Sequence, residues 1–393
     1  MPFKLKPLIW YLATIAIVLS KYLGGPKAYN NYVIYRNVFR HTLQQKNLFA
    51  YYPSEYFDHN LYGPLFSMVI APFALLPDGV GMIAWGTFSM WVLWKGMGCF
   101  WGANPPWLLF ILALVEATTA LSNLQFNVLM AGGLLCAFGL SRQKKDWAAA
   151  AIIAVLILTK IYGVVGLVLI FFSDKPFKLI VYGLIWLVVL GFLPALISSP
   201  DFVIQSYVDW FHTIVDKNEL NQVSHTSVGM QDISAMGLFK RISGNFQMSN
   251  LLFLVPAMFF SIVPLIRFNL LKNVHFQNDY MAQLMIGLVI FSSSSESSTY
   301  IIAVAGYFVS FLSKQSEQSE QSKQGPISYQ IPYTSYLILF LLCVLTILSP
   351  TDLVPKFIRT EYIVKYALKA LPCLLAWIWI SSHLLFKKYS DEA

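Results

Sequence analysis

Charged side chains are scarce in this 393-residue sequence: Asp, Glu, Lys and Arg make up 12% of it, whereas hydrophobic residues make up 57%. Soluble domains contain about a quarter charged residues, so the composition excludes an ordinary soluble enzyme. A helix needs about 20 apolar residues to cross a bilayer, and apolar runs of this kind recur from end to end. The sequence therefore predicts an all-α, polytopic membrane protein in which residues 1–393 form one integral-membrane domain.

Cysteine is also scarce, and the motifs of many soluble enzymes are missing. Cys99, Cys136, Cys343 and Cys373 lie in apolar runs at unrelated spacings, which argues against a disulfide framework or a thiolate metal site. The sequence has no P-loop, no glycine-rich dinucleotide fingerprint, no HExxH and no Cys/His cluster with zinc spacing. The net charge of +8 fits basic loops that face anionic lipid, and it does not indicate nucleic acid. We expect no cofactor and no dedicated metal site.

The positive-inside rule orients the predicted helices. Short loops rich in Lys and Arg stay in the cytoplasm, and SRQKKD is the clearest of them. With the N-terminus retained inside as a first helix, both termini are cytoplasmic and two long loops, 24–63 and 199–250, lie outside. The polar segment 314–328 is expected to be a disordered cytoplasmic linker. Spanning helices are predicted near residues 7–23, 79–101, 106–122, 127–140, 178–198, 251–267, 281–293, 300–313, 329–349 and 368–386.

Two apolar segments depart from simple spanning helices. The run 64–77 is too short to span and is bounded by prolines, so we expect a re-entrant or interfacial helix. The run 147–172 has Lys160 at its middle. One straight helix would hold this ammonium at mid-membrane, which is costly. We therefore favour two short helices that break at Lys160 near the outer surface, for a total of about 10–12 crossings.

The first long loop begins with a helical pattern. Tyr32, Tyr35, Phe39 and Leu43 recur at the spacing of one helix face. This pattern predicts a helix that lies on the membrane surface, with Arg36 on its polar face.

The same loop continues as YYPSEYFDHNLYGP, which combines tyrosines with Glu55, Asp58 and His59. Sugar faces stack on aromatic rings, and a carboxylate accepts hydrogen bonds from hydroxyl groups. A carboxylate also serves as general base on a sugar hydroxyl. The pattern fits sugar binding or, alternatively, an interfacial tyrosine belt with solvated acids.

Two further acids lie in or beside apolar runs. Glu116 is about two turns inside the outer end of its helix, where it could pair with Lys160 or act as a proton or ion site. Gln125 and Asn127 follow in the next polar turn. Glu296 stands in FSSSSESSTY, either as a polar anchor at an outer cavity or as the cap of the next helix.

The order of these features resembles the polyprenol-phosphate-sugar-dependent membrane glycosyltransferases of family 87, which have the GT-C architecture. The outer loop that runs into YGPLF and closes with Leu-Pro resembles the family's Tyr-x-Pro-Leu-Phe segment. SNLQFNVLM resembles its Gly-Gln-x-Asn turn, and LILTKIYGVVGLVL its Lys-x-x-Pro helix. SVGMQDISAMGLFKRISG, followed by FSSSSESSTY, resembles a Ser-containing outer loop ending in Arg and a later Ser-rich turn. The resemblance covers most of the chain.

The sequence departs from the family pattern at three places. The family has an Asp after the first helix as its proposed base, where this sequence has Asn30 and Asn31. Leu124 stands where the family has Gly, and Gly163 where it often has Pro. An asparagine cannot act as a base, so a retained reaction needs another carboxylate. Asp58, in the same outer loop, is the first choice.

The resemblance implies an inverting hexosyltransferase with its active site on the outer face of the plasma (inner) membrane. The donor would be a sugar, often mannose, on a polyprenyl phosphate, and the acceptor a glycan or glycolipid. A carboxylate would deprotonate the acceptor hydroxyl, and cations would stabilise the departing phosphate. The base candidates are Asp58, Glu55 and Glu296; the phosphate-binding candidates are Lys160, Arg241 and Arg36; the sugar-binding candidates are Gln125, Asn127, Tyr56 and Tyr62.

Two other functions stay open. A lipid-linked oligosaccharide flippase or polymerase would share the aromatic and basic outer loops, although a flippase needs a cavity through the membrane. A secondary transporter would use Glu116, Lys160 and Glu296 as a midplane relay and is expected to show internal repeats, which we do not find between the halves. Polar groups gathered on the outer side favour the transferase.

Overall fold

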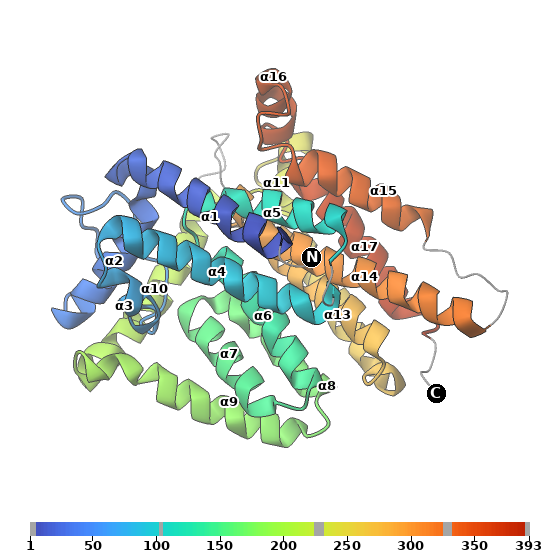
Figure 1. Ribbon diagram of the computed structural model, residues 1–393, viewed down its shortest axis with the longest axis horizontal. Coiled ribbons are helices and arrows are strands. Elements are labelled where there is room, and N and C mark those ends of the chain that lie inside the picture. Colours follow the sequence, from blue (N-terminus) through green and yellow to red (C-terminus); the bar gives the residue numbers. More distant parts are fainter. Residues whose placement is uncertain (1–4, 102–104, 224–231, 325–331, 390–393) are drawn as a thin grey trace. The chain divides into compact units, whose positions relative to one another are not determined.

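The computed structural model describes residues 5–101, 105–223, 232–324 and 332–389, with only the backbone of residues 218–223 and 319–324. Every regular element in these ranges is a helix, so the predicted all-α class is confirmed. Figure 1 traces the helices from α1 to α17.

The chain divides into two compact units. Unit 1 comprises Met1–Cys99 and Ala120–Leu220, and unit 2 comprises Phe100–Thr119 and Asn221–Ala393. That the whole chain acts as one domain stays a prediction.

Helix pairs organise unit 1. α2 (Asn30–Leu43) packs against α3 (Phe66–Ala74). α7 (Asp146–Thr159) packs against α6 (Asn127–Arg142) and α9 (Pro176–Gly191), and these three lie side by side in Figure 1. The other α-helices of this unit are α1 (Leu5–Leu23), α4 (Asp78–Trp101), α8 (Leu169–Phe172) and α10 (Pro200–Val223).

Helix α2 is buried on more than one face. Tyr32, Tyr35 and Phe39 are buried as the helical pattern predicts, but Leu43 is 49% exposed, against that prediction. The residues between them are buried as well: Val33, Ile34, Asn37, Val38, His41 and Thr42. α2 is therefore a helix as predicted, with Arg36 and Arg40 on its less buried side, and its position at a membrane surface stays a prediction.

The chain breaks at Lys160, as predicted. α7 ends at Thr159, Lys160 has an extended backbone (φ −146°, ψ 124°), and the 3₁₀ segment η3 (Ile161–Val168) leads into α8. Gly163 lies in this turn, and its N–H donates to the Lys160 carbonyl at 2.9 Å. A Cβ at this position would lie 2.4 Å from Ile157 N, and a proline would have no N–H to donate.

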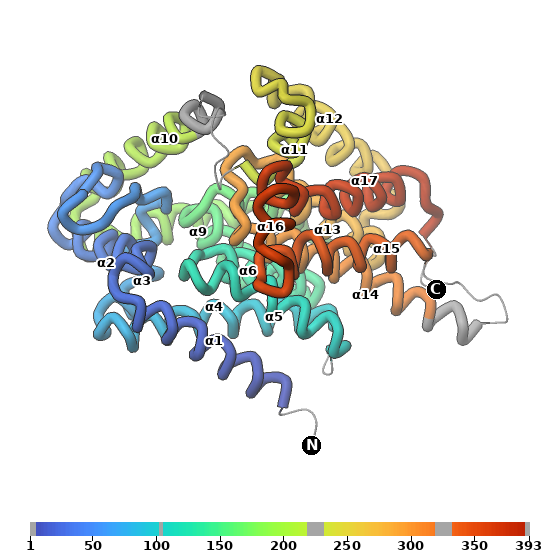
Figure 2. Tube along the Cα trace, turned by 90° about the horizontal axis from the view of Figure 1, so that it is seen from above, coloured from blue at the N-terminus to red at the C-terminus, as the bar shows by residue number. Residues whose placement is uncertain are grey.

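Unit 2 is built on α13 (Val274–Ile290), which packs against α14 (Tyr300–Gln324) and α17 (Ala370–Phe386). Figure 2 shows these helices running beside one another, with α15 (Tyr333–Leu341) next to α17. The other α-helices of this unit are α11 (Ala235–Ser243), α12 (Leu251–Ile262), α16 (Lys356–Ile358) and most of α5 (Trp107–Ser122).

Two segments predicted as loop or linker contain helices. The predicted outer loop 199–250 contains α10 and α11, and the predicted linker 314–328 continues α14 as far as Gln324. The prediction of disorder is therefore wrong up to Gln324, while residues 325–328 lie outside the described residues.

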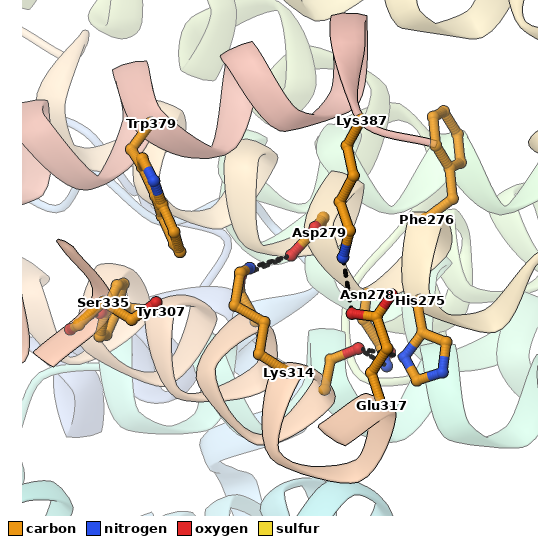
Figure 3. Close-up of polar contacts among 12 residues, drawn as sticks. His275, Phe276, Asn278, Asp279, Tyr307, Lys314, Glu317, Ser335, Trp379 and Lys387 are labelled. Carbon is orange, nitrogen blue, oxygen red and sulfur yellow. Dashed lines mark hydrogen bonds and ion pairs between the residues drawn. The ribbon is translucent and has the colours of Figure 1, made fainter. Parts of the chain in front are cut away.

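Buried ion pairs explain why α14 continues into this polar segment. Lys314 Nζ donates to Asp279 Oδ1 at 2.9 Å, and Lys387 Nζ donates to Glu317 Oε2 at 2.6 Å (Figure 3). The Tyr389 hydroxyl donates to the second Asp279 oxygen at 2.8 Å. Separating a buried charge from its partner is costly. These contacts therefore hold the middle of α14 against α13 and the C-terminal end of α17.

Length and composition identify the helices that are candidates for crossing a membrane. Within the described residues, two helical stretches, Leu5–Leu23 and Pro176–Leu196, are long and apolar enough to cross a membrane. The further apolar helices have 10–17 residues, or about 15–26 Å at 1.5 Å per residue. The predicted 10–12 crossings therefore stay a prediction.

Candidate functional site

The loop between α2 and α3 in unit 1, which carries Asp58, is held by its own side chains. Asn47 Oδ1 accepts the backbone N–H groups of Phe49 at 2.8 Å and Ala50 at 3.0 Å. Farther along, the buried Asn60 Oδ1 accepts the N–H of Tyr62 at 3.0 Å. Asparagine stabilises turns by such side-chain-to-backbone bonds. The loop therefore has a defined path although it contains no helix of its own.

The end of this loop is joined to the end of α7. Gly63 N–H donates to the Thr159 carbonyl at 2.9 Å, and Trp210 Nε1 donates to the Leu61 carbonyl at 3.1 Å. A Cβ on Gly63 would lie 2.2 Å from the Leu158 carbonyl oxygen, so only glycine allows this approach. The loop is thereby fixed beside the helix break at Lys160.

Lys160 is the centre of a polar cluster drawn from three separate segments. Its Nζ donates to Asn127 Oδ1 at 2.8 Å, and Asn127 Nδ2 donates to Gln125 Oε1 at 2.6 Å. The Lys160 Nζ also lies over the rings of Tyr162 and Tyr62, at 4.6 and 6.0 Å from their centroids. Four of the predicted site residues therefore meet here: Lys160, Asn127, Gln125 and Tyr62. We call these four residues and Tyr162 the Lys160 cluster.

Tyr62 connects this cluster to α2. Its hydroxyl is 2.8 Å from that of Tyr35, and its ring stacks on Phe66 at 4.7 Å between centroids. Tyr35 is 1% exposed and Phe66 is fully buried. The ring of Tyr62 is thus held from two sides, which gives the Lys160 cluster a rigid aromatic wall.

The turn that carries Gln125 has an unusual backbone. Leu124 adopts φ +51°, in the left-handed region where glycine is favoured. Its side chain is buried, and its carbonyl accepts a hydrogen bond from Trp85 Nε1 at 3.1 Å. Packing around Leu124 therefore holds a strained backbone in the turn that presents Gln125 and Asn127.

Asp58 is exposed, and one of its oxygens has a fixed contact. Asp58 Oδ1 accepts the N–H of His59 at 2.8 Å. This bond orients the carboxylate and leaves Oδ2 without a hydrogen-bond partner among the described residues. The arrangement is compatible with a base that receives a proton on Oδ2.

Glu55, the second base candidate, is engaged by a histidine. His41 Nε2 donates to Glu55 Oε2 at 2.9 Å, and the His41 ring lies 4.3 Å from that of Tyr52. Burial lowers the pKa of His41, and the Glu55 carboxylate acts in the opposite direction. A neutral His41 is a sufficient partner for Glu55. This pair fastens the loop to α2.

Arg36 and Tyr56 also have structural contacts. Arg36 Nη1 lies 2.5 and 2.6 Å from the two oxygens of Asp78, so its charge is already paired. Tyr56 is 4% exposed, and burial raises the pKa of its hydroxyl. Neither side chain is brought to the Lys160 cluster by the contacts seen here.

Glu296 and Arg241 belong to unit 2. Glu296 precedes the short segment η7 (Ser297–Thr299) in a reciprocal capping box with Thr299, which agrees with the capping alternative. Arg241 Nη1 donates to the Val364 carbonyl at 2.8 Å.

Glu116, also in unit 2, accepts a hydrogen bond from Lys369 Nζ at 2.9 Å, and both side chains are buried. Lys369 Nζ also donates to Ser297 at 3.0 Å. Lys160 donates to Asn127 instead, so the suggested pairing of Glu116 with Lys160 is wrong. In the described part of the chain no group of three or more His, Cys, Asp or Glu side chains is arranged to hold a metal ion.

Sequence reasoning missed the roles of Asn30 and Asn31. Asn30 Oδ1 accepts the N–H of Phe57 at 3.2 Å, and Asn31 Nδ2 donates to the Asn123 carbonyl at 2.8 Å. In the sequence, they stand out only as the place where the family's acid is missing. The signal in the sequence is the pair of adjacent amide side chains, because each can both donate and accept a hydrogen bond.

The family profile of glycosyltransferase family 87 matches residues 60–293, which is more than half of the chain. The matched range contains the Lys160 cluster and begins just after Asp58. No curated protein matches the sequence. From the extent of the profile match, the chain belongs to glycosyltransferase family 87.

Proposed function

We propose that this glycosyltransferase moves a hexose, mannose in the first instance, from a polyprenyl-phosphate sugar to a glycan or glycolipid acceptor. The reaction takes place at the outer face of the plasma membrane. The observation that carries this proposal is the Lys160 cluster, a cation beside amide groups and a tyrosine ring, in a member of this family. The loop with Asp58 is fastened next to it through Gly63.

The chemistry follows from these groups. The acceptor hydroxyl oxygen attacks the anomeric carbon while the bond from that carbon to the phosphate oxygen breaks, and the configuration inverts. Asp58 Oδ2 takes the hydroxyl proton, and the electron pair of the broken bond leaves on the polyprenyl phosphate. Lys160 stabilises the departing phosphate. Gln125, Asn127 and Tyr62 bind the sugar.

Exposed apolar faces support a membrane location. On α9, Leu184 is 58% and Val188 is 62% exposed; on α12, Leu251 is 64% and Met258 is 62% exposed. α1 and α15 expose large apolar side chains as well. Contiguous apolar faces of this extent are uncommon on soluble monomers. They support contact with lipid on both units.

An apolar groove supports a lipid-linked donor. It has a volume of about 240 Å³, lies along α7, η3, α8 and α9, and is lined by Leu and Ile side chains together with small residues such as Ala150, Ala154 and Gly183. Ile157, at one end of the groove, is three residues before Lys160, or about 4.5 Å along the helix. An isoprenoid chain in this groove would have its phosphate near Lys160.

The test is transfer of labelled mannose from polyprenyl-phosphate-mannose by the purified protein in reconstituted vesicles. We expect transfer by the wild type and a loss of about 100-fold or more in Asp58→Asn, since a general base contributes at least that much. Asp216→Asn changes an exposed acid of α10 in the same unit and serves as the control. Absence of transfer from any polyprenyl-phosphate sugar by the wild type contradicts the proposal. Undiminished transfer by Asp58→Asn excludes Asp58 as the base.

A further inference from the structure

The first two residues of α2 reach away from their own helix. The N-cap is Tyr29, and no side chain caps the helix. Asparagine is a preferred capping residue because its side chain can accept a backbone N–H of the first turn. Here Asn30 and Asn31 instead bond to backbone groups 27 and 92 residues away along the chain.

The two bonds lead to the two segments of the proposed site. Asn30 bonds to Phe57, the residue before Asp58, and Asn31 bonds to Asn123, two residues before Gln125. We propose that Asn30 and Asn31 are positioning residues that set the distance between the carboxylate loop and the sugar-binding turn. This inference rests on the proposed function for its catalytic consequence.

The chemistry of each bond is fixed by its backbone partner. A backbone N–H can only donate, so Asn30 acts through its oxygen; a carbonyl can only accept, so Asn31 acts through its NH₂ group. An aspartate can replace the first function but not the second, because an ionised carboxylate is an acceptor only. Replacement by aspartate should therefore preserve the hydrogen bond made by residue 30 and break the one made by residue 31.

The test compares Asn30→Asp with Asn31→Asp in the mannose-transfer assay. We expect Asn30→Asp to keep kcat within about threefold, since its carboxylate still accepts the Phe57 N–H. We expect Asn31→Asp, which sets a carboxylate against the Asn123 carbonyl, to lower kcat about tenfold to 100-fold with KM within about twofold. A displacement of about 1 Å at a reacting group can cost this much. Equal effects of the two substitutions would overturn the proposal.

Asn30→Ala separates positioning from the presence of a new charge. It removes the acceptor without adding a carboxylate, and we expect a tenfold or larger loss of kcat that Asn30→Asp does not show. Retention of wild-type kcat in Asn30→Ala contradicts the role of Asn30.

A second measurement tests the positioning role without an activity assay. Hydrogen exchange in the peptide 51–59, read by mass spectrometry, should accelerate in Asn30→Ala and stay at the wild-type rate in Asn30→Asp. In Asn31→Ala the acceleration should appear in the turn 121–126 instead. Unchanged exchange in both alanine variants refutes the positioning role. Failure of the proposed function itself would be seen separately, as absence of mannose transfer by the wild type.

Discussion

Lys160 directly follows Thr159, the last residue of α7. The C-terminal end of a helix carries partial negative charge and stabilises a nearby cation. The rings of Tyr62 and Tyr162 face the same ammonium, and cation–π contacts add to this stabilisation. A lysine is therefore compatible with this break, although it follows an apolar helix.

Replacement of this cation tests the proposed phosphate site. Lys160→Met keeps the apolar stem of the side chain and removes its charge, so we expect kcat/KM for mannose transfer to fall about 100-fold, the usual scale for one stabilising donor. Lys160→Arg should retain part of the rate. Lys145→Met removes an exposed lysine at the start of α7 and is the matched control. Wild-type kinetics in Lys160→Met would exclude the lysine from the reaction.

The sequence predicts some features of the site and not others. The break at Lys160 is predictable because a charge inside an apolar run is costly, and Gln125 and Asn127 stand out in the neighbouring polar turn. The pairing of Arg36 with Asp78 spans 42 residues. Contacts of this kind depend on how α2 meets α4, which periodicity within one helix does not describe.

At the scale of elements, the groove along α7 and α9 is the feature on which the proposed lipid-linked donor can be tested. Gly183 leaves open space in its wall, since a Cβ at this position would meet no atom within 4 Å. The groove also extends from Ala150 to Ile157 along α7, or about 10 Å. A chain lying there would contribute affinity in proportion to the apolar area that it buries.

Gly183→Leu should therefore make the enzyme less sensitive to the length of the donor chain. We expect KM for a long polyprenyl-phosphate-mannose to rise about 10-fold or more, because about 1.5–3 kcal/mol of apolar contact is lost. KM for a short-chain analogue of one or two isoprene units should stay nearly constant. The comparison of the two donors is the measurement.

Gly98→Leu is the matched control for this variant. Gly98 lies in α4 of the same unit, and a Cβ there also meets nothing within 4 Å, but Gly98 does not line the groove. Equal KM changes for long and short donors in Gly183→Leu, or the same change in Gly98→Leu, would contradict chain binding in the groove.

Composition and packing disagree in α14. The segment KQSEQSEQSKQ is polar and of low complexity, which favours disorder. However, Lys314 is 1% and Glu317 is 2% exposed, and their partners come from α13 and from the end of α17. The sequence shows each of these charges, but it does not show that four of them from three segments pair in one buried network. For this reason the sequence predicts that the helix ends near residue 313, whereas α14 continues to Gln324.

At the scale of the molecule, the charges of unit 2 are sorted along its helices. The network of Asp279, Lys314 and Lys387 joins the N-terminal part of α13, the middle of α14 and the C-terminal end of α17. The contact from Lys369 to Ser297 lies at the other end, before α14 begins. Ser297 and Lys314 are separated by about 25 Å along the chain if the stretch is taken as helical. This spacing is close to the ~30 Å thickness of a hydrocarbon core.

Two charged ends with an apolar stretch between them predict a defined orientation. The basic segments near Lys314 and Lys387 should face the cytoplasm by the positive-inside rule, and the Ser-rich turn should face outward. Ser294 in that turn and Lys388 at the other end are both exposed, so a cysteine at either position is accessible to a reactive probe.

The prediction is a difference in labelling between two single-cysteine variants, Ser294→Cys and Lys388→Cys. The background replaces the native cysteines by alanine: Cys99, Cys136, Cys343 and Cys373. On intact spheroplasts a membrane-impermeant maleimide should label Ser294→Cys and spare Lys388→Cys, and lysis should expose both. Labelling of Lys388→Cys before lysis would contradict the predicted orientation. A reversed barrier would place the Ser-rich turn on the cytoplasmic side, whereas labelling of both before lysis would mean that no bilayer separates them.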